Sequence, residues 1–132
     1  MLQSIRTAPP NSMVFLSDPE IEIVPEIDDR SPTIWTTVSC IAIGCLMFQD
    51  GDSDFRLLSG KGVEIELASI LSIHDQLNLV FDGSIESPNR SLSMSTSEGK
   101  TLLRADIATT NTQVRIWTSH PIEPEMVLIV LG

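Results

Sequence analysis

Hydrophobic and polar residues alternate with a period of two along most of this chain. Such alternation is typical of half-buried β-strands, because successive side chains of a strand point to opposite faces of its sheet. We predict strands over residues 14–16, 21–27, 35–48 with a break near Gly44, 55–58, 63–67, 70–73, 76–81, 92–95, 102–107, 113–118 and 126–131.

Turn-forming residues separate most of these stretches. They are Asp50-Gly51-Asp52, Ser59-Gly60-Lys61-Gly62, Asp82-Gly83, Ser87-Pro88-Asn89, Ser97-Glu98-Gly99-Lys100 and Thr110-Asn111. Turns at intervals of about ten residues are typical of sandwiches and barrels. The pattern therefore predicts an all-β fold: a single-domain antiparallel β-sandwich or barrel with short hairpin turns and little helix.

The two ends of the chain differ in pattern. Residues 1–12 lack the apolar segment of a signal peptide, so we expect a flexible N-terminal lead-in followed by one β-domain over residues 13–132, with Met13 as an alternative start site. Residues 126–131 are apolar at every position. This favours a strand buried on both faces, with a dimer contact as the alternative.

The most unusual stretch is acidic. Residues 18–29 hold six carboxylates and no basic residue, and Glu20, Glu22, Glu26 and Asp28 alternate with apolar positions. An extended backbone places these four carboxylates on one face, where like charges repel unless solvent or a basic partner screens them. One interpretation is an edge strand whose charges prevent aggregation. The other is a docking face for a basic protein.

The overall charge limits the classes of partner. The chain has 18 acidic and 8 basic side chains, a formal net charge of −10. Binding to nucleic acid or to an anionic membrane requires clustered Lys and Arg, so we expect neither partner. No secretory segment is visible, and the longest apolar run, residues 34–48, is interrupted and too short to span a bilayer. We expect a cytoplasmic protein.

Candidate chemistry is sparse. Cys40 and Cys45 are five residues apart, so one regular strand directs them to opposite faces, and we expect two buried, reduced thiols. No residues lie at zinc-ligand spacing. The run Asp50-Gly51-Asp52-Ser53-Asp54 resembles the start of a calcium loop, but Phe55 and Lys61 occupy the positions that require Gly and Glu. We expect no metal and no cofactor.

Catalytic signatures are also missing. His74 and Asp75 are adjacent, so a regular strand directs their side chains to opposite faces, and His120 precedes Pro121 in a predicted loop. Neither histidine accompanies a recognisable nucleophile motif. We therefore expect a protein without enzymatic activity.

Trp35 and Trp117 are the two tryptophans of a chain that has four Phe and no Tyr. β-Branched neighbours surround both, which favours packing in the core or at its rim. The alternative is that one of them anchors a partner, because Trp is enriched among binding hot spots.

Two stretches of the chain carry short motifs. The first holds Trp35-Thr36, Gly44, Asp50-Gly51 and Phe55, and the second holds Asp106-Ile107, Gln113-Val114 and Trp117-Thr118. The pattern of these two stretches, about a third of the chain, resembles the competence protein J family, whose members inhibit a DNA-entry nuclease. The resemblance implies a nuclease partner, and it supplies no inhibitory residues.

These observations favour a small acidic protein-binding module, an inhibitor or immunity protein for a basic nuclease or toxin. Its expected partner-binding residues are Glu20, Glu22, Glu26, Asp28, Trp35 and Trp117. A homo-oligomer is compatible with the pattern. The alternatives are a non-catalytic β-sandwich that binds a small ligand or carbohydrate, and a hydrolase on a β-scaffold.

Overall fold

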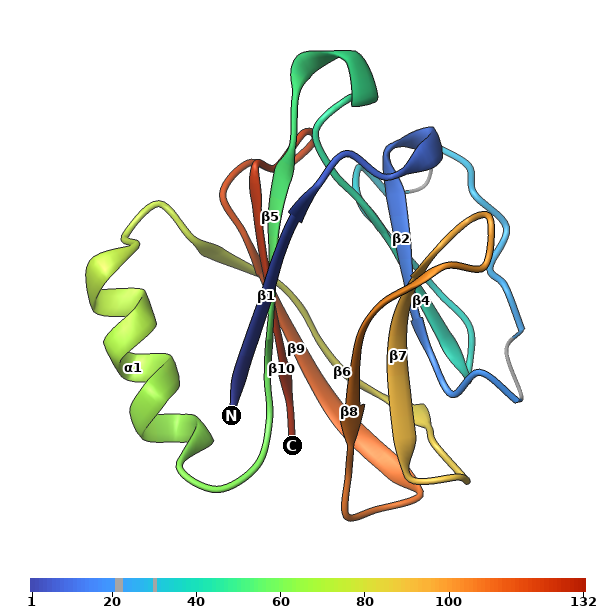
Figure 1. Ribbon diagram of the computed structural model, residues 1–132, viewed down its shortest axis with the longest axis vertical. Coiled ribbons are helices and arrows are strands. Elements are labelled where there is room, and N and C mark those ends of the chain that lie inside the picture. The colour runs from blue at the N-terminus through green and yellow to red at the C-terminus, as the bar shows by residue number, and fades with distance from the viewer. Residues whose placement is uncertain (21–22, 30) are drawn as a thin grey trace.

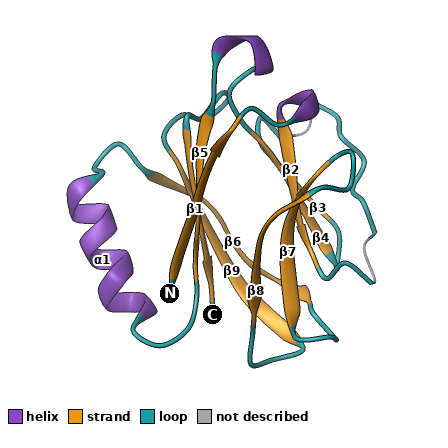
Figure 2. Cartoon of the chain, in the orientation of Figure 1, coloured by secondary structure: helices purple, strands orange, loops and turns teal. Residues whose placement is uncertain are grey.

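Two five-stranded sheets face one another in the computed structural model of the chain, which describes residues 1–20, 23–29 and 31–132 (Figures 1 and 2). Sheet A has the strand order β1-β5-β10-β9-β6, and sheet B the order β3-β4-β2-β7-β8. The strands are β1 (Leu2–Thr7), β2 (Met13–Ser17), β3 (Ile34–Thr36), β4 (Cys40–Gly44), β5 (Ser53–Leu58), β6 (Asn78–Glu86), β7 (Ser91–Thr96), β8 (Thr101–Asp106), β9 (Asn111–Thr118) and β10 (Met126–Leu131). The predicted all-β sandwich is confirmed.

The main core lies between the two sheets. Sheet A contributes Phe55, Val114 and Ile129, and sheet B contributes Leu16 and Ile43, all of them fully buried. These residues alternate with outward-facing ones, as the period of two predicts. Neighbouring strands are antiparallel, except that β10 pairs with β5 in parallel.

A helix covers the outer face of sheet A, where two strands were predicted. Residues 63–67 and 70–73 belong to α1 (Val63–Ile73), and that prediction was wrong. Val63, Leu67 and Ile70 recur at helical spacing and are buried in an apolar cluster that also contains Leu128 and Val130 of β10. Because the core covers its other face, β10 is buried on both faces, which confirms that prediction. Among the described residues, none of the helices combines the length and the apolar character that a membrane span requires.

The N-terminal residues form a strand rather than the flexible lead-in that we expected. β1 pairs along its whole length with β5, and Ile5 packs against the main core. The Gln3 side chain also donates a hydrogen bond to the backbone carbonyl of Arg104 in β8, 2.8 Å away. The prediction failed because it used only the local pattern of residues. That pattern does not show that β1 pairs with β5, a strand about fifty residues away in sequence.

Two further boundaries differ from the prediction. Asp82-Gly83 is not a turn, because β6 runs through both residues and pairs with Arg115 and Val114 of β9. A side chain at Gly83 would place its Cβ 2.8 Å from the ring of Phe81, so packing explains this glycine. The predicted strand 35–48 is two strands, β3 and β4, joined through residues 37–39, and β4 ends at Gly44 as expected.

The two cysteines are buried on different sides of sheet B. Cys40 packs with Phe15 and Ala42 on the outer face, and Cys45 lies in the main core. They are not joined in a disulfide, as predicted. Burial raises the pKa of the Cys45 thiol to about 11, although a hydrogen bond with Ser53 opposes the shift.

We expect the Cys45 thiol to react slowly in the native protein. In a Cys40→Ser variant, disulfide exchange with a thiol reagent at pH 8 should be about a hundredfold slower in the folded state than in urea, because only the thiolate attacks. The absorbance of the released chromophore measures both rates. Equal rates in the two states would contradict the burial of Cys45.

Candidate protein-interaction surface

The acidic segment forms no strand over residues 23–28, and the predicted strand 21–27 is wrong for the part that the structure describes. Residues 21 and 22, and with them Glu22, lie outside the described residues. Pro25 provides a physical reason, because proline has no N–H to donate to a strand ladder. The segment runs along the outer side of sheet B, on the opposite side of the sandwich from α1 (Figure 1).

Side-chain hydrogen bonds attach this segment to β3 and to the turn that follows it. The Ile23 N–H donates to Ser39 Oγ at 3.1 Å, and Thr37 Oγ1 donates to the Ile23 carbonyl at 2.6 Å. Further along, Trp35 Nε1 donates to the Asp28 carbonyl at 2.9 Å. Pro25 is buried between these attachments. The segment is therefore held at both ends against the sheet.

Asp18 anchors the start of the acidic segment and is itself fully buried. Its carboxylate accepts hydrogen bonds from the Asn89 N–H at 2.8 Å, Asn89 Nδ2 at 3.1 Å and the Glu20 N–H at 3.1 Å. Burial alone raises the pKa of Asp18, but these hydrogen bonds and the charge of Arg104 outweigh it and hold the pKa below its ordinary value. Asp18 thus has a structural role.

The remaining described carboxylates of the segment face solvent. Glu20, Glu26 and Asp29 are exposed, and Asp28 is partly exposed. We call these four residues the acidic surface. Three of the predicted partner-binding residues, Glu20, Glu26 and Asp28, thus lie along one exposed segment, although they do not form the face of a strand.

The two tryptophans have different environments. Trp35 is half-buried on the outer face of sheet B, and its hydrogen bond to Asp28 places it beside the acidic surface. Trp117 is buried beneath α1 on the far side of the sandwich, with the Arg115 guanidinium 5.8 Å from its ring centre. The structure therefore brings Trp35 together with the acidic residues and separates Trp117 from them.

Exposed apolar side chains accompany the acidic surface, and the sequence analysis did not identify them. Ile23 is 58% exposed, Val24 54%, Ile27 43% and Val38 60%. Val38 adjoins the segment, because Thr37 and Ser39 on either side of it both hydrogen-bond to the backbone of Ile23. We call these four residues the apolar strip. The available signal was Pro25, which argued against a regular strand that buries alternate residues.

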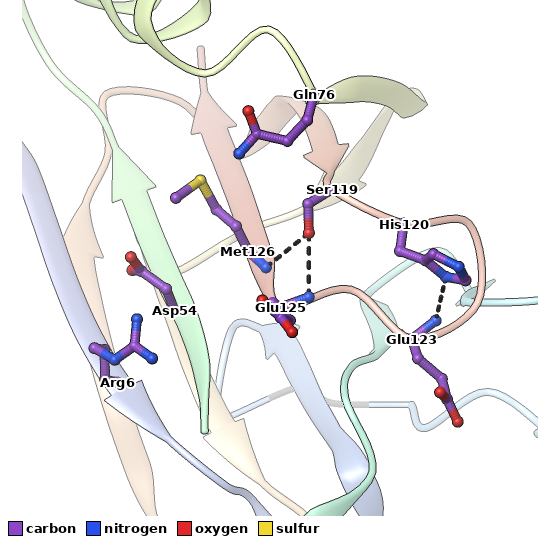
Figure 3. A pocket seen from close by; sticks show the side chains of 8 residues that line it. All are labelled: Arg6, Asp54, Gln76, Ser119, His120, Glu123, Glu125 and Met126. Carbon is purple, nitrogen blue, oxygen red and sulfur yellow. Dashed lines mark hydrogen bonds between the residues drawn. The ribbon is translucent and has the colours of Figure 1, made fainter. Parts of the chain in front are cut away.

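A polar cavity of about 370 Å³ lies at one end of sheet A (Figure 3). Its lining residues are Arg6, Asp54, Gln76, Ser119, His120, Glu123, Glu125 and Met126. His120 Nδ1 accepts the N–H groups of Ile122 and Glu123, and Ser119 Oγ accepts those of Glu125 and Met126, at 3.0–3.1 Å. The histidine and the serine therefore stabilise their own loop, which favours a structural role for both.

A second, more apolar cavity of about 740 Å³ lies beside the N-terminus of α1. Val63, Ile65, Ile107 and Leu131 line it, together with polar groups that include Lys61 and Asp106. Its volume is within the range of small-molecule sites.

In the described part of the chain, no three His, Cys, Asp or Glu side chains gather as a metal ion would require.

Comparisons with known proteins give a likeness in fold. No family model matches the sequence, and no curated protein matches it. The fold is similar to the crystal structure of ComJ, inhibitor of the DNA degrading activity of NucA, from Bacillus subtilis, with a TM-score of 0.55. The match covers 99% of this chain and 97% of that chain, at 10% sequence identity. The predicted resemblance to competence protein J is thus confirmed at the level of the fold.

Proposed function

We propose that this chain is a non-catalytic protein-binding module that inhibits a basic, nuclease-type protein. The acidic surface, whose segment is hydrogen-bonded to sheet B beside Trp35, is the observation that carries the proposal. The net charge of −10 favours a cationic partner, and the fold shared over nearly the whole chain with ComJ, itself an inhibitor of a DNA-degrading activity, supports an inhibitory role. We also propose a cytoplasmic location.

Capture followed by an activity assay tests this function. The immobilised chain is exposed at low salt to an extract of the organism that encodes it, and each retained protein is purified and assayed for degradation of plasmid DNA. We expect one retained protein to degrade DNA and the added chain to suppress that activity. Retained proteins without DNA-degrading activity, or with activity that the chain leaves unchanged, would refute the proposal.

Neutralising the acidic surface should slow association without unfolding the protein. For a Glu20→Gln, Glu26→Gln, Asp28→Asn variant we expect an association rate about tenfold lower at low salt and a weaker salt dependence, because steering charges are lost. Stability should change by less than about 0.5 kcal/mol per site, since these side chains are wholly or partly exposed. Stopped-flow association with the captured nuclease and thermal unfolding measure the two effects.

A matched variant separates local steering from net charge. Asp52→Asn, Asp75→Asn and Glu98→Gln remove the same number of charges from exposed positions outside the acidic surface. We expect its association rate to stay near the wild-type value. Equal slowing by both variants would mean that only the total charge matters.

Binding of a small ligand is the second candidate, and the apolar cavity beside α1 favours it. Cavities of this size with apolar walls and a few polar groups commonly hold small molecules. A thermal-shift screen with sugars, nucleotides and small apolar acids and amines tests it, because a ligand that binds only the folded state raises the melting temperature. The cavity-specific control is Ile107→Asp, which should abolish any shift produced at this site.

A further inference from the structure

We propose that the apolar strip, Ile23, Val24, Ile27 and Val38, is the centre of a docking surface and that the acidic surface is its rim. The partner then presents a small apolar patch flanked by Lys or Arg side chains. The inference rests on the proposed protein-binding function and specifies the chemistry of the partner's contact face.

The exposure of the strip is the first argument. Three of its four residues belong to one seven-residue segment, and the fourth adjoins Ile23 through the turn at residues 37–39. Single exposed apolar residues are ordinary, but several exposed apolar residues gathered near acidic ones are characteristic of interaction sites. The segment buries Pro25 and leaves the larger side chains of Ile23 and Ile27 mostly or partly in solvent.

The rigidity of the strip is the second argument. The backbone that carries it is attached at Ile23 and again at Asp28, and Asp18 fixes its start. A surface held in place before binding loses little conformational entropy when a partner docks, which increases the net affinity. The hydrogen bonds of Trp35 and Thr37 to this segment therefore position the strip.

Charge identifies the partner. Every charged side chain of residues 18–29 is a carboxylate, and those of Glu20, Glu26 and Asp29 are exposed. A second copy of this chain would bring a like-charged rim against them, which is unfavourable. A partner with a basic rim is attracted by the carboxylates, while its apolar centre covers the strip. Interfaces commonly have this arrangement of apolar core and polar border.

Short peptides test the surface without any nuclease. The probe peptide is Lys-Lys-Leu-Phe-Leu-Lys-Lys, and its two controls replace the centre with three serines or the flanks with glutamates. Amide chemical shifts of the full chain are followed by nuclear magnetic resonance. We expect the probe to shift amides of residues 23–29 and 38, to bind at least about tenfold more tightly than either control, and to weaken with salt.

Two triple variants make the test specific. Val24→Ser, Ile27→Ser and Val38→Ser should weaken the probe peptide about tenfold, because exposed apolar contacts are removed. Ile73→Ser, Leu79→Ser and Ile122→Ser remove exposed apolar groups elsewhere and should leave binding unchanged. Melting temperatures near wild type establish that both variants fold.

Each contrary result overturns one part of the proposed docking surface. Equal binding of the serine-centred peptide eliminates the apolar centre, and equal binding of the glutamate-flanked peptide eliminates the basic rim. Amide chemical-shift changes that are spread over other surfaces would reject the proposed location of the docking surface. If the peptide test fails but the chain still suppresses a captured nuclease, the proposed function stands and its binding surface lies elsewhere.

Discussion

Replacing Trp117 with alanine is expected to lower the free energy of unfolding by about 3–5 kcal/mol, the usual cost of truncating a buried aromatic side chain. Trp117 is only 9% exposed and belongs to the cluster that joins α1 to sheet A. Its removal leaves a cavity in the buried cluster that includes Leu67 and Ile70, and it eliminates the contact with the Arg115 guanidinium. Urea unfolding followed by circular dichroism measures the change.

The control for this prediction lies on the same helix. Ile65 is 81% exposed, so Ile65→Ala should change stability by less than about 0.5 kcal/mol. Binding to a partner should be unaffected in Trp117→Ala at temperatures where it remains folded, because Trp117 lies on the far side of the sandwich from the acidic surface. Wild-type stability combined with lost binding would instead make Trp117 a partner anchor.

Replacing Asp18 with alanine is expected to cost about 3 kcal/mol. A buried carboxylate that accepts three hydrogen bonds contributes more than a neutral group, and its loss leaves the Asn89 N–H without its acceptor. The turn that contains Asn89 and the start of the acidic segment should both loosen. Asp18→Asn retains the size of the side chain and should cost less.

The pH dependence of this contribution has a definite sign. The folded-state pKa of Asp18 is lower than that of an unfolded aspartate, so its ionised form stabilises the native protein. The stabilisation is complete above the unfolded pKa of about 4 and is lost as the pH falls through the folded pKa. The stability difference between wild type and Asp18→Asn should therefore shrink between pH 5 and pH 2. A difference that stays constant over this range would contradict the shifted pKa.

Most of the sheet structure was predictable from the sequence. β2, β5, β7, β8, β9 and β10 all coincide closely with stretches of alternating or continuous apolar residues. Residues 63–73 were misassigned because Val63, Ile65 and Leu67 satisfy a period of two while Val63, Leu67 and Ile70 satisfy the helical period. The outer face of β10 decided between the two periods, because Leu128 and Val130 on that face are buried only when a helix packs against them.

The candidate surface was only partly predictable. The sequence alone determined the acidity of residues 18–29, the separation of Cys40 from Cys45 and the identity of the apolar side chains, because these depend on composition and local spacing.

The tertiary structure decided which of these groups lie close together. Asp18 became a buried anchor because Asn89, 71 residues away, donates to it, and Trp117 became a core residue because α1 folds over it. Ile23, Val24 and Ile27 lie in solvent on a segment that side-chain hydrogen bonds from residues 35–39, rather than a strand ladder, attach to the sheet. Such long-range contacts leave no periodic trace in the chain, so only the folded arrangement establishes them.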